Sequence, residues 1–587
     1  MIHQHEWVPR RYSLVGDVAV AGEPAQPGAS LSLVSTDHGK PARFTFEALW
    51  PTLFRTTFTT EDHPRPPHPS ARRPASAFRH ASPASTSSDQ RKCIELGRVS
   101  AVVDWTDAPV VSLYLDGEQK PIHRDLNFRS YAVDATGVAH YTAYKRDTLH
   151  VGLGEKAAPM NLANRHFIIS ATDCFGYDVY RTDPLYKHIP LLINVTPRGC
   201  VAIFSTSHSR GTWSVGSEVD GLWGHYKVYR QAHGGLEEYL IVGRTVRDVL
   251  KTYADLVGYP KLVPRWALGY IAGGMKYSMM DEPRACDAHL EFAAKLKSHD
   301  IPCSAFQMSS GYTVAETEPK TRNVFTWNRH RFPDPKAFAD AFHALGIRLI
   351  ANVKPYLLAN HPEYKKLAET GAFFIDPRTN GTAVARLWSA GGGESGEGSH
   401  IDFTSDAGFK WWVEGVKDLR LVGIDGIWND NNEVCVSHDD WQCALDNVSP
   451  VAPGPSPSEK HIGLWGRAMQ TELMAKASHD ALVDIEPNIR PFILTRSATA
   501  GTMRYASSSW SGDNVTSWDG MKGANALSLN AGMSLLQVGQ VTLGPSAVPA
   551  NRRSLMVMTL VGLKVPSRPL SSFFVGFSSV CTLPVLP

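Results

Sequence analysis

The sequence predicts an α/β protein in which a (β/α)8-type barrel follows an N-terminal β-sandwich. Up to residue 243, short β-rich runs alternate with Gly, Asn, Asp and Pro turns, as in a sandwich. After Pro264, apolar strands alternate with amphipathic helical segments, which is typical of βαβ units on a parallel sheet. A chain of 587 residues, 43% of them hydrophobic, is long enough to form several domains.

The sandwich is expected in residues 1–260. Clear β-rich runs begin at Val110, His140, Phe167 and Tyr239. Residues 61–92 are crowded with Pro, Ser, Arg and His and lack apolar periodicity, so we expect a mobile loop there. Thr245 and Asp248 form the pattern of a capping box, which predicts a helix that ends at Gly258. This helix is expected to connect the two domains.

The barrel is expected in residues 261–537. Six candidate strands begin near Trp266, Cys303, Ile347, Ile424, Phe492 and Ala506. Helical segments are predicted between them, for example over residues 334–345 and 406–419, and the Gly-, Glu- and Ser-rich stretch 389–400 is predicted to be a flexible excursion. Because the parallel strands of a barrel end at one face, polar residues directly after them should gather there.

Two of these strand ends carry carboxylates that suit a catalytic pair. The apolar run that begins at Gly423 leads directly to Asp430, and a later strand end carries Asp513. Cleavage of a glycosidic bond with retention needs one carboxylate to attack the anomeric carbon and one carboxylic acid to protonate the leaving oxygen. These two groups must lie about 5–5.5 Å apart. Asp430 and Asp513 can fill the two roles if the fold brings them together.

The motifs around these aspartates resemble the signature motifs of glycoside hydrolase family 31, the retaining α-glucosidase and α-xylosidase family. They are Trp428-x-Asp-x-Asn-Glu433 and Trp510-x-Gly-Asp513, and the resemblance runs over about residues 185–537. It implies a TIM barrel, a mutarotase-like β-sandwich before the barrel and a double displacement. It also implies that Asp430 is the nucleophile and Asp513 the general acid/base.

The same resemblance implies a set of substrate-binding residues. Arg496 matches the substrate-binding arginine of the family, and Trp428 and Trp510 match aromatic residues that line its sugar pocket. Asn431 occupies a place that is usually filled by Met, a change that is expected to retune the substrate contacts around the nucleophile.

The second barrel strand departs from the family at the place where the sugar is recognised. Ser309 and Gly311 stand where many relatives carry aspartates, one of which binds the terminal hydroxyls of the sugar. Without these carboxylates, the hydrogen bonds to the outer hydroxyls should weaken. We therefore expect the sugar specificity to be relaxed or shifted.

Several other polar residues near the motifs are expected to serve the structure. Asp425 is expected to be a turn or structural carboxylate, and Glu433 to orient its neighbours. Arg504 is expected to hold Arg496 or Asp513 through hydrogen bonds. Residues 438–441 contain a His and two Asp, but they supply too few well-spaced ligands for a metal, so we expect a solvated loop.

The last fifty residues differ from the rest of the chain. Residues 538–587 are rich in Ser, Pro, Val and Leu and contain no carboxylate. Shifting the reading frame from Met556 onward gives codons that can spell the next family segment. We therefore expect an intron-like stretch over 538–555, an out-of-frame tail after it and a barrel that lacks its last strands.

Composition and charge narrow the class of partner. A net charge of +2 without basic clusters argues against nucleic acid and membrane surfaces, and the start lacks a signal peptide, so a cytoplasmic location is expected. Eight cysteines without a CxxC pair suggest no metal site, and no cofactor is expected.

The function expected from the sequence is a retaining, exo-acting hydrolase that releases α-linked glucose-like units from oligosaccharides. Two alternatives remain. One is a sugar-binding remnant whose truncated barrel impairs catalysis, and the other is an α-xylosidase or transglycosidase that uses the same residues. The sequence leaves open the sugar, the linkage and the oligomeric state.

Overall fold

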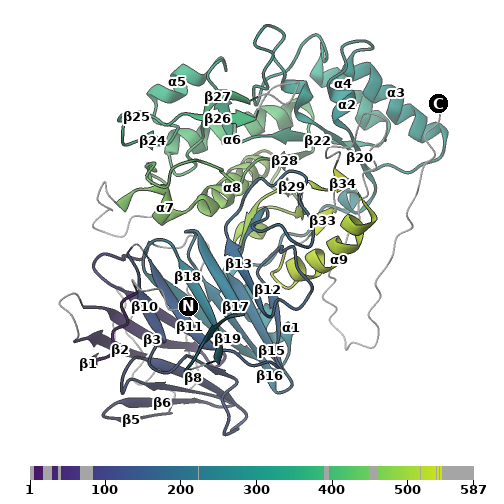
Figure 1. The fold of residues 1–587 in the computed structure, drawn as a ribbon. Helices are drawn as coiled ribbons and strands as arrows, with labels where there is room; N and C mark the ends of the chain where they lie inside the picture. The colour runs from purple at the N-terminus through teal and green to yellow at the C-terminus, as the bar shows by residue number, and fades with distance from the viewer. Residues whose placement is uncertain are drawn as a thin grey trace.

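The computed structural model places a β-sandwich beside a curled parallel sheet with flanking helices (Figure 1). It describes residues 6–16, 30–36, 41–66, 84–135, 137–222, 224–388, 395–448, 459–515, 517–536, 538–540 and 543–544. In this part of the chain, no helix is both long and apolar enough to cross a membrane.

The sandwich is built around one antiparallel sheet of eight strands. Its order is β1 (Tyr12–Gly16), β2 (Ser30–Ser35), β3 (Arg43–Trp50), β4 (Leu53–Thr59), β19 (Leu236–Gly243), β16 (Gly199–Ser205), β15 (Leu191–Thr196) and β12 (Leu149–Gly152). A five-stranded sheet has the order β10 (Tyr131–Val133), β11 (Val138–Ala143), β18 (Gly224–Gln231), β17 (Gly211–Asp220) and β13 (Arg165–Ile169). Buried side chains of both sheets, such as Phe44, Phe58 and Trp213, form a common core.

A third antiparallel sheet consists of β5 (Ala84–Ser88), β6 (Arg91–Leu96), β7 (Val99–Asp104), β8 (Val110–Leu115) and β9 (His123–Arg124). The predicted loop over residues 61–92 is therefore wrong at its C-terminal end, where β5 pairs with β6. All five residues of β5 are exposed, so this edge strand shows no apolar alternation in the sequence. Residues 67–83 lie outside the described residues.

The connecting helix α1 (Val246–Val257) follows the prediction. Thr245 and Asp248 form the reciprocal capping box, and Gly258 ends the helix. The helix packs its apolar face on the sandwich, where the Tyr253 ring meets the Phe204 ring edge-on with centroids 5.1 Å apart. This packing fixes the direction in which the chain enters the second domain.

In the part of the second domain that the structure describes, seven parallel strands form one curled sheet. Their order is β20 (Ile271–Gly273), β21 (Ala305–Met308), β22 (Arg348–Val353), β28 (Gly426–Asn429), β29 (Phe492–Thr495), β31 (Ser508–Trp510) and β33 (Val538–Gln540). Side chains alternate between a cluster inside the curl, which includes Ile350 and Leu494, and a cluster under the helices, which includes Ala351 and Ile493. Within the described residues, the fold is thus an open TIM-barrel sheet, as expected for an incomplete barrel.

Helices and short strands complete the second domain. The helices are α2 (Met275–Ser278), α3 (Ala285–Ser298), α4 (Pro335–Ala344), α5 (Tyr364–Glu369), α6 (Asp406–Val422), α7 (Ile462–Trp465), α8 (Arg467–Ile485) and α9 (Trp518–Gly532), with 3-10 turns at Arg265–Leu268, Ser310–Thr313 and Thr502–Arg504. Short strands are β23 (Tyr356–Leu358), β24 (Ile375–Asp376), β25 (Gly381–Thr382), β26 (Ala385–Trp388), β27 (Ser395–His400), β30 (Ala498–Thr499), β32 (Asn514–Val515) and β34 (Leu543–Gly544), and β14 (Lys187–His188) of the sandwich pairs with β30.

One strand position and part of one predicted excursion in this domain are wrong. The first barrel strand begins at Ile271 rather than near Trp266, because Arg265–Leu268 forms a 3-10 turn directly after Pro264. Part of the expected excursion is the strand β27, which pairs with β23 and β26; residues 389–394 lie outside the described residues.

The segment predicted to be an aberrant tail contributes two short strands. β33 pairs with β31 at the edge of the sheet, and β34 pairs with β32. Residues 545–587, and with them the expected out-of-frame segment, lie outside the described residues.

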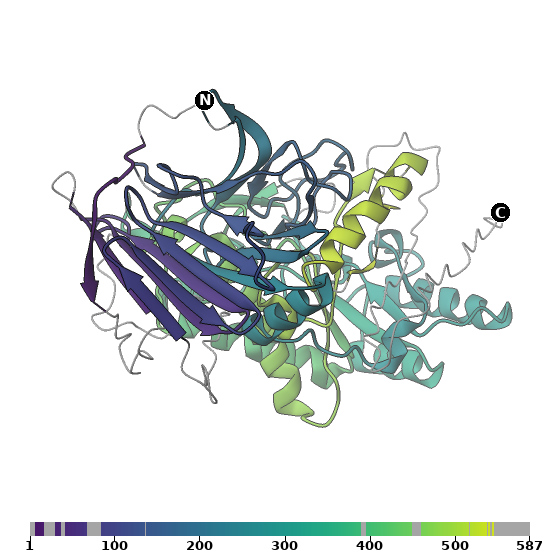
Figure 2. The ribbon, with the colours of Figure 1, turned by 90° about the horizontal axis from the view of Figure 1, so that it is seen from below.

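The interface between the sandwich and the barrel lies close to the ends of the barrel strands. β14, which leaves the sandwich, pairs in parallel with β30 of the barrel. Helix α9 lies next to β12 (Figures 1 and 2), where the side chains of Asn530 and Ser534 accept hydrogen bonds from the amides of Gly152 and Gly154. Sandwich loops can therefore contribute side chains to the barrel mouth.

Candidate active site

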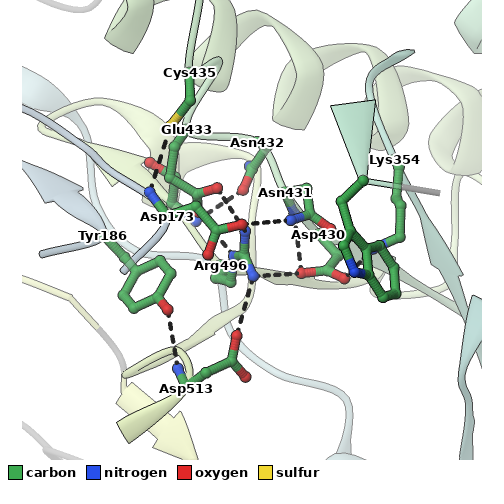
Figure 3. A network of polar contacts seen from close by, with 12 residues as sticks. Asp173, Tyr186, Lys354, Asp430, Asn431, Asn432, Glu433, Cys435, Arg496 and Asp513 are labelled. Carbon is green, nitrogen blue, oxygen red and sulfur yellow. Dashed lines mark hydrogen bonds and ion pairs between the residues drawn. The ribbon is translucent and has the colours of Figure 1, made fainter. Parts of the chain in front are cut away.

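Asp430 lies directly after β28, at the carboxyl end of the sheet, where its amide donates to the Val353 carbonyl oxygen at 3.0 Å. The side chain is buried and both carboxylate oxygens are occupied (Figure 3). Oδ2 accepts from Lys354 Nζ at 2.5 Å and from Asn352 Nδ2 at 3.0 Å. Oδ1 accepts from the Asn431 amide at 2.9 Å.

The charges around Asp430 favour its ionised form. Burial alone would raise the pKa of this carboxyl, but the nearby charges of Lys354 and Arg496 and the hydrogen bond from Asn352 outweigh burial. They hold the pKa of Asp430 well below its usual range. The group is a carboxylate at neutral pH, the state that a nucleophile needs.

Asp513 lies three residues after β31 and is held by the sandwich. Its carbonyl oxygen accepts from the Gly176 amide at 2.7 Å, and its amide donates to the Tyr186 hydroxyl at 3.3 Å. Its side chain is 25% exposed, and Oδ2 accepts from Arg496 Nη1 at 3.2 Å. This leaves the carboxyl partly open to a ligand.

The surroundings of Asp513 shift its pKa in the opposite direction to that of Asp430. Burial raises the pKa of Asp513, the Arg496 charge opposes this rise, and the negative charge of Asp430 adds to it. The net result is a raised pKa, which keeps the proton on Asp513 to higher pH than on an ordinary aspartate. Two carboxyls with opposed shifts are the arrangement expected for a base or nucleophile beside an acid.

Arg496 connects the two aspartates. Its Nη1 lies 3.4 Å from Asp430 Oδ1 and 3.2 Å from Asp513 Oδ2. Because both oxygens contact the same nitrogen, they are less than about 7 Å apart, which is compatible with the short separation that retention requires. Glu433 binds the other edge of the guanidinium at 2.9 and 2.7 Å, as expected for a residue that orients its neighbours.

The sandwich adds two side chains that the sequence analysis missed. Asp173 lies 2.9 Å from Arg496 Nη2 and accepts from Asn431 Nδ2 at 2.8 Å. The Tyr186 ring lies against the Arg496 guanidinium, 4.9 Å from its carbon. Asp173 sits in a loop with no distinctive local pattern, and Tyr186 lies inside the region of resemblance, which alone could have pointed to it.

Lys354 and Asn352 were also missed, although a signal was present. β22 was predicted as a strand, and Asn352 and Lys354 lie at its carboxyl end. The rule that the polar residues at strand ends of a barrel gather at one face would have placed them beside Asp430.

The two predicted tryptophans, Trp428 on β28 and Trp510 on β31, lie inside the curl of the sheet. The rings of Trp428 and Trp510 meet edge-on with centroids 5.6 Å apart, and they pack in one cluster with Leu494 and Ile350. Trp510 is buried and Trp428 is partly exposed. The two residues thus form an edge-to-face pair within an apolar cluster.

Asn431 links the nucleophile loop to its surroundings. Its φ of 49° puts the backbone in the left-handed region that asparagine tolerates, and its side chain bridges Lys354 and Asp173. Gly311 has no room for a side chain, since a Cβ there would lie 2.5 Å from the Ser278 carbonyl oxygen. Ser309 is buried at the end of β21 and supplies a hydroxyl in place of a carboxylate.

Of the residues expected to serve the structure, Asp425 behaves as predicted, whereas Arg504 has a partner other than the expected ones. Asp425 accepts from the Leu349 amide at 2.9 Å and from His343 at 2.7 Å, so it ties β22 to α4. Arg504 was expected to hold Arg496 or Asp513, but its guanidinium pairs with Glu472 at 2.6 Å. Within the described ranges, no group of three or more His, Cys, Asp and Glu side chains is placed to hold a metal.

Comparison with known proteins matches both domains of the chain to one family. The model for the TIM-barrel domain of glycosyl hydrolases family 31 matches residues 260–542, and the model for the galactose mutarotase-like N-terminal domain of the same family matches residues 43–213. The two domain models thus indicate one class of protein, the glycosyl hydrolases of family 31. The chain belongs to this family.

Individual relatives are distant and longer. The chain is 27% identical over 385 residues to alpha-glucosidase 2 of Bacillus thermoamyloliquefaciens, a match that covers 65% of this chain and 45% of that protein. It is 27% identical over 301 residues to alpha-xylosidase XylQ of Lactiplantibacillus pentosus, covering 49% of this chain and 36% of that protein. The chain spans about half the length, or less, of these relatives.

Among solved structures, the fold resembles a family 31 dextranase of Flavobacterium johnsoniae in complex with glucose. The TM-score is 0.74 at 20% identity, and the match covers 91% of this chain and 60% of that chain. At this identity the similarity concerns the fold alone.

Proposed function

We propose that this chain carries the catalytic site of a retaining, exo-acting glycosidase that releases α-linked glucose-like units from oligosaccharides. The observation that supports it most is the pair Asp430 and Asp513, two carboxyls with opposed pKa shifts that contact one nitrogen of Arg496. Names of relatives, an alpha-glucosidase and an alpha-xylosidase, agree with this class of reaction.

In the first step of the proposed reaction, Asp430 attacks the anomeric carbon. The bond between this carbon and the glycosidic oxygen breaks, and the proton of Asp513 moves to the leaving oxygen. The product is a glycosyl ester on Asp430 and a free alcohol. Arg496 stays charged throughout and balances the negative charge that passes from Asp430 to Asp513.

In the second step, water attacks the anomeric carbon of the ester. Asp513, now a carboxylate, takes the proton of the water, and the electron pair of the ester bond returns to Asp430. Two inversions give net retention. Transfer to a sugar hydroxyl instead of water would give transglycosylation by the same steps.

A second class of substrate, the α-xylosides, is also a candidate. Ser309 and Gly311 offer no carboxylate for the outer hydroxyls of the sugar, and Gly311 leaves no space for one. A sugar without the exocyclic CH2OH group, such as xylose, loses less in such a pocket than glucose does. An α-xylosidase is therefore the alternative that this observation favours.

The test is turnover of chromogenic α-glucoside and α-xyloside by the purified chain, with the anomer formed first identified by NMR. We expect the α-anomer of the released sugar to appear first, and a ratio of kcat/KM for the two substrates close to one. Release of the β-anomer would exclude the retaining mechanism. Binding of both sugars without turnover would instead identify a sugar-binding remnant.

A further inference from the structure

Lys354 is a buried cation that touches the proposed nucleophile directly. It follows β22, and only 5% of its surface is exposed. Its Nζ donates to Asp430 Oδ2 at 2.5 Å and also to Asn431 Oδ1. The ammonium lies 4.9 Å from the centre of the Trp388 ring, so an aromatic face supports it from another side.

The two oxygens of Asp430 have different surroundings. Oδ2 accepts hydrogen bonds from two side chains. They are Asn352, which lies in β22, at 3.0 Å, and Lys354, which directly follows β22, at 2.5 Å. Oδ1 lies 3.4 Å from Arg496 Nη1, the nitrogen that also contacts Asp513. Figure 3 shows Lys354 and Arg496 on opposite sides of the Asp430 carboxylate. Oδ1 is therefore the Asp430 oxygen that faces the acid/base Asp513. In a substrate whose glycosidic bond lies between the two carboxyl groups, the anomeric carbon is next to Oδ1.

We propose that Lys354 is a positioning residue for Asp430, which holds Oδ2 so that Oδ1 attacks, and which stabilises the carboxylate when it leaves the sugar. This inference rests on the proposed function, since it assigns a role within the double displacement. Lys354 gives up no proton in either step and acts through its charge and its two hydrogen bonds.

The role of Lys354 differs between the two steps. When the ester forms, Oδ1 bonds to the anomeric carbon and the negative charge of Asp430 disappears. The attraction between the Lys354 ammonium and Asp430 therefore becomes weaker. When water cleaves the ester, the electron pair of the bond returns to Asp430, and the ammonium stabilises this charge as it develops. Loss of the ammonium should therefore slow the second step more than the first.

The other charged groups around Asp430 determine what remains without Lys354. Those that influence Asp430 from neighbouring elements are Arg496, Arg322, Glu433, Asp513 and Tyr356. Lys354 is the cation that donates a hydrogen bond to Asp430 at 2.5 Å, while Arg496 lies 3.4 Å away. Removing it should raise the pKa of Asp430, and the acidic limb of the pH profile of kcat/KM should move to higher pH.

The experiment compares Lys354→Met with the unaltered chain on an aryl α-glycoside with an acidic phenol. We expect the acidic limb of kcat/KM to rise by at least about one pH unit and kcat to fall at least about 10-fold, with a burst of phenol equal to the enzyme concentration. Lys354→Arg, which keeps the charge, should restore the position of the acidic limb. Lys366→Met on α5, whose side chain is 77% exposed, removes one charge elsewhere and should match the unaltered chain.

The outcomes separate this inference from the proposed function. An unchanged acidic limb in Lys354→Met, or equal limbs in the Met and Arg variants, would overturn the role of Lys354 while leaving the glycosidase in place. If the unaltered chain turned over no α-glycoside, the proposed function itself would fail. If Lys354→Met failed to fold, Lys354→Arg would be compared with Asn352→Leu instead. Equal shifts of the acidic limb to higher pH in these two variants would overturn the inference.

Discussion

The backbone carbonyl of Asp513 accepts a hydrogen bond from the backbone amide of Gly176 at 2.7 Å. Gly176 belongs to a sandwich loop and Asp513 to the barrel, so this bond joins the proposed acid/base to the other domain. Tyr186 adds a second link, since its hydroxyl accepts from the Asp513 amide at 3.3 Å. The sandwich is thus part of the site, and its role can be tested at single residues.

Tyr186→Phe should impair protonation of the leaving group. The change leaves the Asp513 amide without its acceptor and lets the acid/base loop move, at a cost of about 1–3 kcal/mol for the unpaired amide. We expect kcat/KM to fall about 10-fold on substrates with poor leaving groups and little on aryl glycosides with acidic phenols. Steady-state kinetics on both substrate types checks this.

The matched control for Tyr186→Phe is Tyr180→Phe, which removes the same atom from an exposed residue of the same loop region. It should leave both rates unchanged. Equal losses on the two substrate types in Tyr186→Phe would contradict a role through Asp513.

Lys187 should matter for stability more than for chemistry. It is buried, donates to the carbonyl oxygens of Arg496 and Trp510, and lies 3.3 Å from the buried carboxylate of Glu155. Lys187→Met leaves Glu155 buried and unpaired, and breaking such a pair costs about 3–5 kcal/mol. We expect the denaturant midpoint to fall accordingly.

The double variant Lys187→Met with Glu155→Gln should recover part of the lost stability, because it removes the uncompensated charge. Chemical denaturation followed by tryptophan fluorescence measures both. A double variant that is less stable than the single one would show that the two residues do not act as a pair.

His140 should give the sandwich a stability that depends on pH. The buried ring lies 2.9 Å from Asp125 and 2.5 Å from Glu238. Burial alone would lower its pKa, but the two carboxylates outweigh burial and raise the pKa of His140 to about 10. Because the pKa of His140 is higher in the folded than in the unfolded chain, its protonation stabilises the fold. This stabilisation is complete below the unfolded-state pKa near 6.5 and is lost as the pH rises toward 10.

We therefore expect the free energy of unfolding to decrease between about pH 6.5 and pH 10, and His140→Gln to remove most of this slope. Denaturant titrations at several pH values give the measurement. His299→Gln, at an exposed helix end, is the control and should keep the slope. A slope in His140→Gln equal to that of the unaltered chain would contradict the assignment.

The fold could be predicted from patterns because its strands are buried on one or both faces. The runs at Val110 and Phe492 carried enough apolar periodicity to be recognised, and both are strands. The exposed strand β5 carried none, since its stability comes from backbone hydrogen bonds to β6. A Ser- and Thr-rich edge strand cannot be distinguished from a loop by composition.

The candidate site also contains residues that could be predicted from the sequence and residues that could not. Asp430, Arg496 and Asp513 follow strands in recognisable motifs, and the structure brings them within contact of one another. Asp173 could not be found, because it reaches the site only through the packing of two domains that are far apart in sequence. Lys354 could have been found from its place at a strand end, but the residue type alone suggested no role.

Asp513→Ala tests most directly whether Asp430 and Asp513 have the different roles of nucleophile and acid/base. With an aryl α-glycoside whose phenol is acidic, this variant should still form the glycosyl ester but hydrolyse it slowly, because no base activates the water. Mass spectrometry of peptides from the quenched reaction should find one sugar on Asp430. A sugar on another residue, or no covalent adduct in a variant that releases phenol in a burst, would contradict the assignment.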